Sequence, residues 1–374
     1  MDVDVLVVGA GIVGLALAAE LASDCSVVVV ERHASYARET SSHNSGVIHS
    51  GIYYQTGSWK HRLCLEGNAA LYDWCARQGV THQRLGKLIV ATSRDDLEQL
   101  EAIEARALAN EVPGVRRLSG REARSLEPRI PAVEALFSGT TGIVDQMALA
   151  RSFEAAARHG GATFAYRHRA VAGHRRGGMF HVKLLDDDDA LSELSCRQVV
   201  NAAGHGAPQV AEALGYPLDG SGQVPVLQQR PNRGRYYDVV NPTVARGVRH
   251  LVYPVRREGD AGLGVHITLD VDGGMHLGPD AEWMTAEEPL DYRNDDSRRD
   301  EFVSAARRLL PTLRDADLVP GQVGYRPKLS DAPSGEPDFM LWHDEGYVHL
   351  GGIESPGLTA SIAIARAVAT MLRE

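Results

Sequence analysis

Residues 3–31, VDVLVVGAGIVGLALAAELASDCSVVVVE, decide the fold at the start of the chain. The valine-rich run from Val3 to Val8 is typical of a buried parallel strand. Good helix formers fill residues 15–22, and the valines within residues 26–30 predict a second strand. This order predicts a βαβ unit of about 30 residues.

Three glycines between the first strand and the helix form the pattern G-x-G-x-x-G. Gly9 permits the tight turn, Gly11 lets the backbone approach a pyrophosphate, and Gly14 allows the helix to pack closely on the strand. The helix N-terminus, with Ile12 and Val13, offers free N–H groups and a partial positive charge. The strand before the motif and the helix after it therefore predict a dinucleotide site.

An acidic residue at the end of the second strand narrows the choice of dinucleotide ligand. Glu31 is expected to accept hydrogen bonds from a ribose diol and to repel a 2′-phosphate, which disfavours NADP. Arg32 beside it is a further candidate cofactor contact. A bound flavin or NAD would each explain a single motif, but NAD leaves a glycine-rich cluster near the C-terminus without a role.

Composition excludes some classes of function. The formal net charge of -10 argues against non-specific nucleic-acid binding, and an anionic substrate would need local cations. The four cysteines form no CxxC pair, so no metal site is expected, and their sparseness suits the cytoplasm. We expect neither a signal peptide nor a spanning helix, with peripheral membrane contact left open.

The remaining sequence differs in pattern from this βαβ unit and predicts a second sheet with further helices. A polar stretch over residues 40–57 is typical of a functional loop. Short β-like runs at 235–239, 251–255, 264–269 and 275–277 indicate an antiparallel sheet. Helices are predicted over residues 63–78, 94–110, 147–159, 300–310 and 358–372, the third capped by Asp145. A length of 374 residues favours two domains.

Three further stretches resemble a known family. They are residues 42–54 (SHNSGVIHSGIYY) with Gly57 and Ser58, residues 264–266 after Tyr253 and Pro254, and residues 351–361 (GGIESPGLTAS) preceded by residues 326–329. With the glycine motif, they make the whole chain similar to the D-amino-acid-oxidase-like superfamily of flavoproteins. Within it, the chain most resembles the L-2-hydroxyglutarate dehydrogenases and oxidases.

The resemblance implies an α/β fold. A Rossmann-like FAD-binding domain would be assembled from residues 1–85, 143–212 and 322–374. An α+β substrate domain with an antiparallel sheet would be inserted as residues 86–142 and 213–321. The cofactor would be FAD, and the electron acceptor could be oxygen, a quinone or a carrier protein.

The implied reaction is oxidation of a small 2-hydroxy acid, similar to L-2-hydroxyglutarate, by hydride transfer to flavin. An amino-acid or amine oxidase on the same fold is the alternative. A flavin-binding RNA-modification or assembly protein is a third reading, which the acidic balance disfavours. Discrimination between the first two requires a substrate panel, because amine oxidation releases ammonia.

Oxidation of a hydroxy acid needs a base for the hydroxyl proton and a cation for the carboxylate. His49 is the first candidate base, because imidazole titrates near neutral pH and the residue lies in the family-like loop. His266 is the alternative base or a substrate ligand. Arg326 is the candidate carboxylate clamp, since a guanidinium fork matches a carboxylate. Tyr253 is a candidate hydrogen-bond donor, as are two tyrosines of the early loop.

The resemblance also implies the remaining cofactor contacts. The final helix's N-terminus would face the pyrimidine edge of the flavin and stabilise its reduced state. Val171 would contact the adenine side through its backbone. The implied contacts are Thr40, Ser41, Ser42, Asn44, Ser45, Val171, Ala203, Gly204, Gly352, Ile353, Glu354, Ser355, Pro356, Gly357, Leu358 and Thr359.

Overall fold

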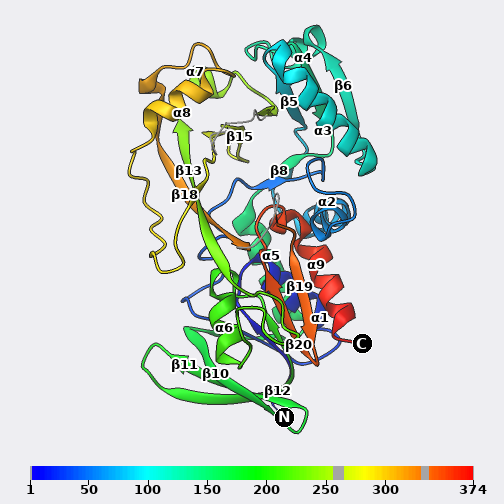
Figure 1. Ribbon diagram of the computed structural model, residues 1–374, viewed down its shortest axis with the longest axis vertical. Helices are drawn as coiled ribbons and strands as arrows, with labels where there is room; N and C mark the ends of the chain where they lie inside the picture. Colours follow the sequence, from blue (N-terminus) through cyan, green and yellow to red (C-terminus); the bar gives the residue numbers. More distant parts are fainter. Residues whose placement is uncertain (1, 256–264, 330–336, 374) are drawn as a thin grey trace.

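Two large sheets occupy opposite ends of an elongated molecule (Figure 1). The computed structural model describes residues 2–255, 265–329 and 337–373. Both chain termini lie with the lower sheet in this view, and the upper sheet is built from segments in the middle of the chain. The predicted α/β architecture is confirmed by this arrangement.

The lower sheet has eight strands. Its strands are β1 (Val3–Val8), β2 (Val27–Glu31), β9 (Thr163–Tyr166), β10 (His168–Arg176), β11 (Met179–Asp186), β12 (Leu191–Asn201), β19 (Met340–Asp344) and β20 (Tyr347–Gly351). β1 pairs in parallel with β2 and β12, as the valine-rich runs predict. β9 and β20 extend this parallel core, whereas β10, β11 and β12 form an antiparallel meander.

β10 was not predicted from the sequence. Its residues include several histidines and arginines, and most are partly or fully exposed, so no apolar alternation marks the strand. The pairing of β10 with β11 shifts register between Ala170 and Ala172, which leaves Val171 in a β-bulge. A bulge redirects the backbone locally, and here it falls at the residue predicted to reach the adenine.

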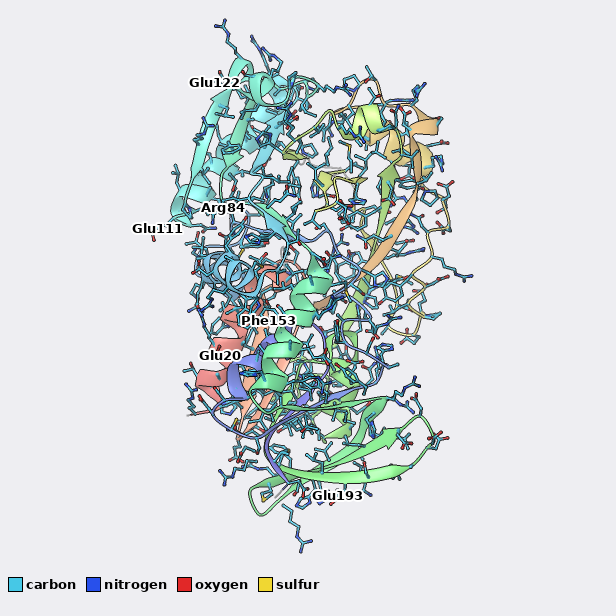
Figure 2. All side chains as sticks on the ribbon, turned by 180° about the vertical axis from the view of Figure 1, so that it is seen from behind. Glu20, Arg84, Glu111, Glu122, Phe153 and Glu193 are labelled. Carbon is cyan, nitrogen blue, oxygen red and sulfur yellow. The ribbon has the colours of Figure 1, made fainter. Side chains whose placement is uncertain are left out.

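Helices cover the lower sheet and form its main core. They are α1 (Ile12–Leu21), α2 (Trp59–Gln78), α5 (Gln146–His159), α6 (Ala207–Ala213) and α9 (Gly357–Met371). α1 packs against both α5 and α9, and α2 also packs against α9. Phe153 is buried in this core, and its helix α5 faces the viewer in Figure 2, which shows the molecule from behind.

Helix starts follow their capping residues. The Asp145 carboxylate accepts hydrogen bonds from the backbone N–H groups of Met147 and Ala148, which confirms the predicted cap of α5. α2 begins at Trp59, four residues before the predicted start, because the Ser58 side chain accepts a bond from the His61 N–H. The predicted helix over 300–310 is α8 (Arg299–Ala306), which ends four residues early.

The upper sheet has nine strands. They are β5 (Lys87–Ala91), β6 (Val115–Ser119), β7 (Glu134–Ser138), β13 (Gln229–Val239), β14 (Leu251–Pro254), β15 (Ile267–Leu269), β16 (Met275–Leu277), β17 (Glu282–Trp283) and β18 (Leu318–Leu329). Residues 256–264, which include the start of one predicted strand, lie outside the described residues. α3 (Leu97–Ala109), α4 (Gly120–Leu126), α7 (Pro242–Ala245) and α8 accompany this sheet.

One junction departs from the predicted antiparallel pattern. β5 and β14 pair in parallel, with Tyr253 beside Ile89. These strands come from separate segments of the chain, so no hairpin turn forces them to run in opposite directions. The other pairings within this sheet are antiparallel among the described strands.

A third, three-stranded sheet joins the two lobes. It consists of β3 (Val47–Ile48), β4 (His82–Gln83) and β8 (Gly142–Val144). The predicted domain boundaries stay a proposal. Because β18 crosses the boundary between residues 321 and 322 and pairs with β13 along its length, we propose that the substrate domain extends to Leu329. Among the described residues, the helices are too short or too polar to span a bilayer.

Candidate active site

A cavity of about 1400 Å³ runs between the two lobes. Its walls come from the end of β1, the start of α1, the loop over residues 37–58, the strands β13 and β18, and the loop before α9. Pockets for drug-sized ligands usually measure about 300–1000 Å³, so this cavity has room for a larger molecule.

The glycine motif forms one end of the cavity. Gly9 has φ +107°, and a Cβ on it would lie 2.6 Å from the carbonyl oxygen of Ala202. A Cβ on Gly14 would overlap the carbonyl oxygen of Gly9, so the helix can approach the strand only with glycine there. Gly11 caps α1 without a side-chain hydrogen bond. The Ile12 N–H donates to the Ser41 hydroxyl at 2.9 Å, so this loop meets the helix N-terminus.

Two acidic residues organise the cavity near the end of β2. Glu31 is buried, and its carboxylate accepts hydrogen bonds from the N–H groups of Ala10 and His33, both at 2.8 Å. Arg32 pairs instead with Glu39. Burial opposes ionisation of Glu39, but the charge of Arg32 and the hydrogen bond from His33 hold its pKa below the usual value. Glu31 is thus fixed at the cavity wall, where the sequence predicts the ribose.

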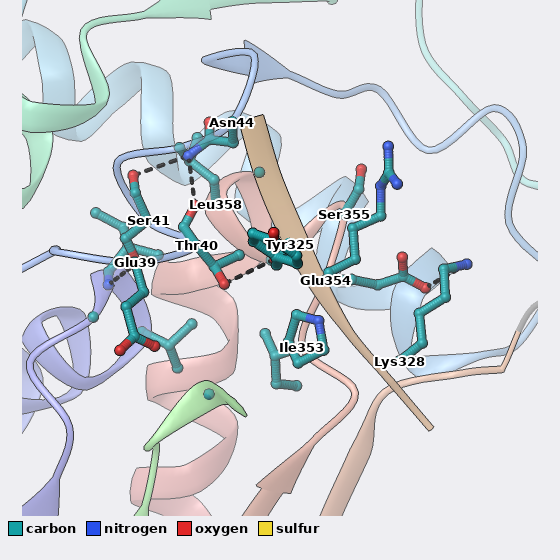
Figure 3. Close-up of a pocket in the computed structure, with 18 of the residues that line it drawn as sticks. Glu39, Thr40, Ser41, Asn44, Tyr325, Lys328, Ile353, Glu354, Ser355 and Leu358 are labelled. Atoms are coloured by element: carbon teal, nitrogen blue, oxygen red, sulfur yellow. Dashed lines mark hydrogen bonds and ion pairs between the residues drawn. The ribbon is translucent and has the colours of Figure 1, made fainter. Parts of the chain in front are cut away.

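Residues 40–45 are tied to distant strands. The Asn44 amide donates to the carbonyl oxygens of Thr40 at 3.1 Å and Ser41 at 2.9 Å, and the Thr40 hydroxyl donates to the Tyr325 carbonyl at 3.0 Å (Figure 3). These bonds close the loop on itself and anchor it to β18. The loop therefore presents its polar groups at a fixed position along the cavity.

His49 lies between the early loop and the start of α9. Its N–H donates to the Thr359 hydroxyl at 2.9 Å, and its carbonyl accepts from the Asn68 amide at 2.8 Å. Its Nε2 lies 3.2 Å from the Ser355 hydroxyl. Burial, with a smaller effect from the charge of Lys87, lowers the pKa of His49 to about 3. The imidazole is therefore neutral at pH 7, and a nearby negative charge would favour its protonated form.

Two more predicted catalytic residues form a stacked pair. The rings of Tyr253 and His266 lie parallel, 3.7 Å apart between centroids with 3° between their planes. Both line the same cavity as His49. Stacking fixes the plane of the His266 imidazole, which suits a group that must face a substrate in one orientation.

Arg326 reaches the cavity from β18. Its guanidinium donates to the Asn232 side-chain oxygen at 2.7 Å and to the Asp280 carbonyl at 3.1 Å. The Asp280 carboxylate is buried and paired with Arg235 at 3.0 Å and Arg298 at 2.8 Å. Within residues 2–255, 265–329 and 337–373, no carboxylate forms an ion pair with Arg326, so its charge is not neutralised there.

The loop before α9 closes the other wall. Glu354 is buried between two lysines, with its Oε1 2.9 Å from Lys60 Nζ. The same oxygen lies 3.2 Å from Lys328 Nζ, and Figure 3 shows these two side chains together. α9 begins at Gly357 without a side-chain cap. The free N–H groups of its first turn therefore carry partial positive charge at the cavity wall.

Most predicted site residues line this one cavity. All four predicted catalytic residues do so, as do these cofactor candidates: Gly9, Gly11, Ile12, Val13, Glu31, Arg32, Thr40, Ser41, Asn44, Ser45, Val171, Ala203, Gly204, Ile353, Glu354, Ser355, Pro356, Gly357 and Leu358. Four candidates lie behind the wall: Gly14, Ser42, Gly352 and Thr359. Of these, Thr359 holds the backbone of His49, and the Gly352 N–H donates to Gln229 at 2.8 Å.

Sequence reasoning missed several residues of the site. Tyr236 is buried, which raises its pKa, and it interacts with both Ser45 and Arg326. Lys60 and Asn232 were also missed. Each lies outside the motif stretches, on an element that only the tertiary fold brings to the cavity, so no local pattern could reveal it.

Comparisons with known proteins identify the family of this chain. Residues 4–371 match the family described as "FAD dependent oxidoreductase" (DAO). The chain is 36% identical to the mitochondrial L-2-hydroxyglutarate dehydrogenase of Arabidopsis thaliana, covering 98% of this chain and 83% of that protein. It is 28% identical to L-2-hydroxyglutarate dehydrogenase of Escherichia coli, covering 96% and 91%.

Among solved structures, the L-α-glycerophosphate oxidase of Mycoplasma pneumoniae with FAD bound superposes with a TM-score of 0.85. The two sequences are 26% identical, and the match covers 100% of this chain and 95% of the oxidase. The chain thus belongs to the DAO family of FAD-dependent oxidoreductases, and FAD is its cofactor.

The residues present fit FAD. A diphosphate fits the glycine turn, where α1 has no side-chain cap and a Cβ on Gly11 would lie 3.2 Å from the Ser41 hydroxyl. Glu31 lies on one side of that turn and His49 with the α9 N-terminus on the other, and a single cavity connects them. We therefore propose that the Glu31 end would hold the ribose and the His49 end the isoalloxazine.

Proposed function

We propose that this protein oxidises a small 2-hydroxy acid to the 2-oxo acid, with L-2-hydroxyglutarate as the leading substrate. The relatives named as L-2-hydroxyglutarate dehydrogenases support this choice, since they match nearly the whole chain. The single observation that carries the substrate class is Arg326, a cavity-lining cation without a carboxylate partner among the described residues.

Arg326 is oriented for a carboxylate. Its bonds to Asn232 and to the Asp280 carbonyl hold the guanidinium plane without neutralising its charge. The nearby Asp280 carboxylate is already shared by two other arginines. A substrate carboxylate can therefore bind the guanidinium fork through charge-assisted hydrogen bonds.

His49 takes the hydroxyl proton in this proposal. The neutral Nε2 accepts the proton of the substrate hydroxyl, and FAD, when bound, would supply the acceptor for the hydride of the carbon that bears this hydroxyl. A substrate carboxylate within about 4–6 Å favours the protonated imidazole and so raises the pKa of His49 during binding. The Ser355 hydroxyl near Nε2 and the Thr359 bond to the backbone keep the ring aimed at the cavity. His266 is the alternative base.

A substrate panel tests this proposal. The purified FAD-bound protein is mixed without oxygen with L-2-hydroxyglutarate, D-2-hydroxyglutarate, L-glutamate or glycine, and the visible flavin band is followed. We expect rapid bleaching with the L-hydroxy acid alone and formation of a 2-oxo acid without ammonia. Bleaching by an amino acid with release of ammonia would instead favour the amino-acid oxidase alternative.

We also propose a cytoplasmic location, which four free cysteines support because a reducing compartment keeps thiols reduced. Oxygen, a quinone and a carrier protein remain the candidate acceptors, and a quinone would favour peripheral membrane contact. Cell fractionation tests the location. Reoxidation of the reduced protein by air, by a soluble quinone or by neither identifies the class of acceptor.

A further inference from the structure

Lysine is rare in this chain and gathers at the cavity. Of the 39 lysines and arginines, four are lysines: Lys60, Lys87, Lys183 and Lys328. Lys60 and Lys328 line the cavity and share Glu354, and Lys183 is exposed on β11. Lys87, the first residue of β5, is 1% exposed and was not part of the predicted site.

Lys87 is held by aromatic rings. Its Nζ lies 4.8 Å from the ring centroid of Tyr53 and 4.6 Å from that of Tyr253. Among the described residues, no carboxylate lies within ion-pair distance of it. An ammonium group is costly to bury without an anion, and the two ring faces offset part of that cost through cation–π attraction.

The two rings connect Lys87 to the catalytic candidates. Tyr53 and Tyr253 line the cavity, and Tyr253 stacks on His266. Lys87 lies behind this wall and does not line the cavity itself. Its charge also acts on His49, whose other contacts, Ser355, Thr359 and Asn68, are neutral.

We propose that Lys87 is a positioning residue for the oxidation: its ammonium group holds the rings of Tyr53 and Tyr253 in place at the cavity wall, against the substrate. This inference rests on the proposed function in that His49 and these rings serve the hydroxy acid. A neutral side chain of the same length would fill the space but would lose the cation–π attraction to the two rings.

The charge of Lys87 depends on pH at mildly alkaline values. Burial lowers the pKa of Lys87 to about 8, and the Cys64 thiol of α2 opposes this shift. The titratable groups that face it are Tyr53, Tyr253, Cys64 and His49. Lys87 is therefore charged below about pH 8 and neutral above it, so positioning is expected to weaken as the pH rises through that value.

Three variants separate charge from packing. Lys87→Arg keeps the charge at all accessible pH values, Lys87→Met keeps the bulk only, and Lys183→Met is the surface control. Each is purified, its FAD content is measured, and the rate of anaerobic flavin reduction by L-2-hydroxyglutarate is followed from about pH 6 to 10. Glutarate, which cannot be oxidised at a hydroxyl group, serves as a binding probe through its effect on the flavin spectrum.

We expect the wild-type rate to fall above about pH 8 and the Lys87→Arg protein to lose this fall. The Lys87→Met protein should be roughly 10- to 100-fold slower without an alkaline fall, because misplaced groups at a reacting centre cost rates of this order. Glutarate should bind it about tenfold more weakly. Lys183→Met should match the wild type.

Wild-type rates and an unchanged pH profile in Lys87→Met would overturn the proposal. If the Lys87→Met protein does not retain FAD, the Lys87→Arg protein decides instead. A rate that still falls at alkaline pH in Lys87→Arg would also overturn the proposal. If no hydroxy acid reduces the wild type, the proposed function fails separately. Glutarate binding then decides for Lys87: weaker binding in Lys87→Met supports positioning, and equal binding excludes it.

Discussion

The two ends of the cavity are built in different ways. At the Glu31 end, the glycine turn and Glu31 come from one continuous segment, and the glycines are required by turn geometry and close packing. At the His49 end, side chains come from β14, β18 and the loops around them, with Lys87 of β5 behind the cavity wall. The first end is therefore encoded locally, whereas the second exists only after both sheets have assembled. Their responses to substitution should differ accordingly.

The largest effect is expected at the backbone-built end. Gly14→Ala forces a methyl group into the carbonyl oxygen of Gly9. We expect a loss of about 3 kcal/mol or more in the free energy of unfolding and failure to retain FAD. The control is Gly139→Ala, where the nearest atom lies at 3.4 Å and little change is expected. Thermal unfolding and the flavin content of the purified protein measure both; a yellow, stable Gly14→Ala protein would contradict the packing argument.

Substitution of the base should affect chemistry without affecting the fold. We expect His49→Gln to retain FAD and to slow anaerobic flavin reduction about 10²- to 10⁴-fold, the usual contribution of a general base. If His266→Gln shows the larger loss, the base assignment moves to that residue.

The wild-type pH profile provides an independent check on His49. Since its pKa is lowered to about 3, the imidazole is neutral above that pH in the free protein. The kcat/KM of the wild type should therefore stay flat as the pH falls from 7 to about 5. An acidic fall centred near pH 6.5 would show that the imidazole is not desolvated as described.

Removal of the carboxylate clamp should weaken substrate binding more than it slows the reaction step. We expect Arg326→Met to lower kcat/KM about 10²- to 10³-fold, since loss of one partner from a desolvated ion pair costs a few kcal/mol. Arg326→Lys should recover part of this. The exposed Arg366 of α9 supplies the control variant Arg366→Met, and glutarate affinity distinguishes binding from catalysis. Equal affinity in the Arg326→Met and Arg366→Met proteins would refute the clamp.

The smallest effect is expected away from both ends. Asp145→Ala removes the cap of α5 and should cost about 1 kcal/mol of stability. For a chain of this size, that corresponds to a Tm lower by about 2 °C. The rate of flavin reduction should not change, and a change in that rate would mean that α5 influences the cavity.

Contiguous patterns explain what could be predicted from the sequence. The βαβ unit follows from valine runs and glycine spacing, and the α5 cap from a single aspartate. β10 escaped prediction because its exposed face is rich in Arg and His. The parallel pairing of β5 with β14 escaped because it joins distant segments without a turn.

Prediction from the sequence was also limited at the His49 end of the cavity. His49, Tyr253, His266 and Arg326 were proposed one by one, through resemblance, and their meeting in one cavity depends on tertiary packing. The sequence did not predict a role for Lys87 in the site, because a lysine at the start of an apolar strand is expected to face solvent. Two tyrosine rings accommodate its buried ammonium group. Tyr53 lies 34 residues before Lys87 in the chain, and Tyr253 lies far after it.

A crystal structure of the FAD-bound protein with 2-oxoglutarate tests the central claim most directly. The account predicts a carboxylate of the ligand on the Arg326 guanidinium, its 2-oxo group facing His49, and the flavin ring between His49 and the start of α9. A ligand bound elsewhere, or a carboxylate held by other cations while Arg326 contacts only Asn232 and the Asp280 carbonyl, would contradict it.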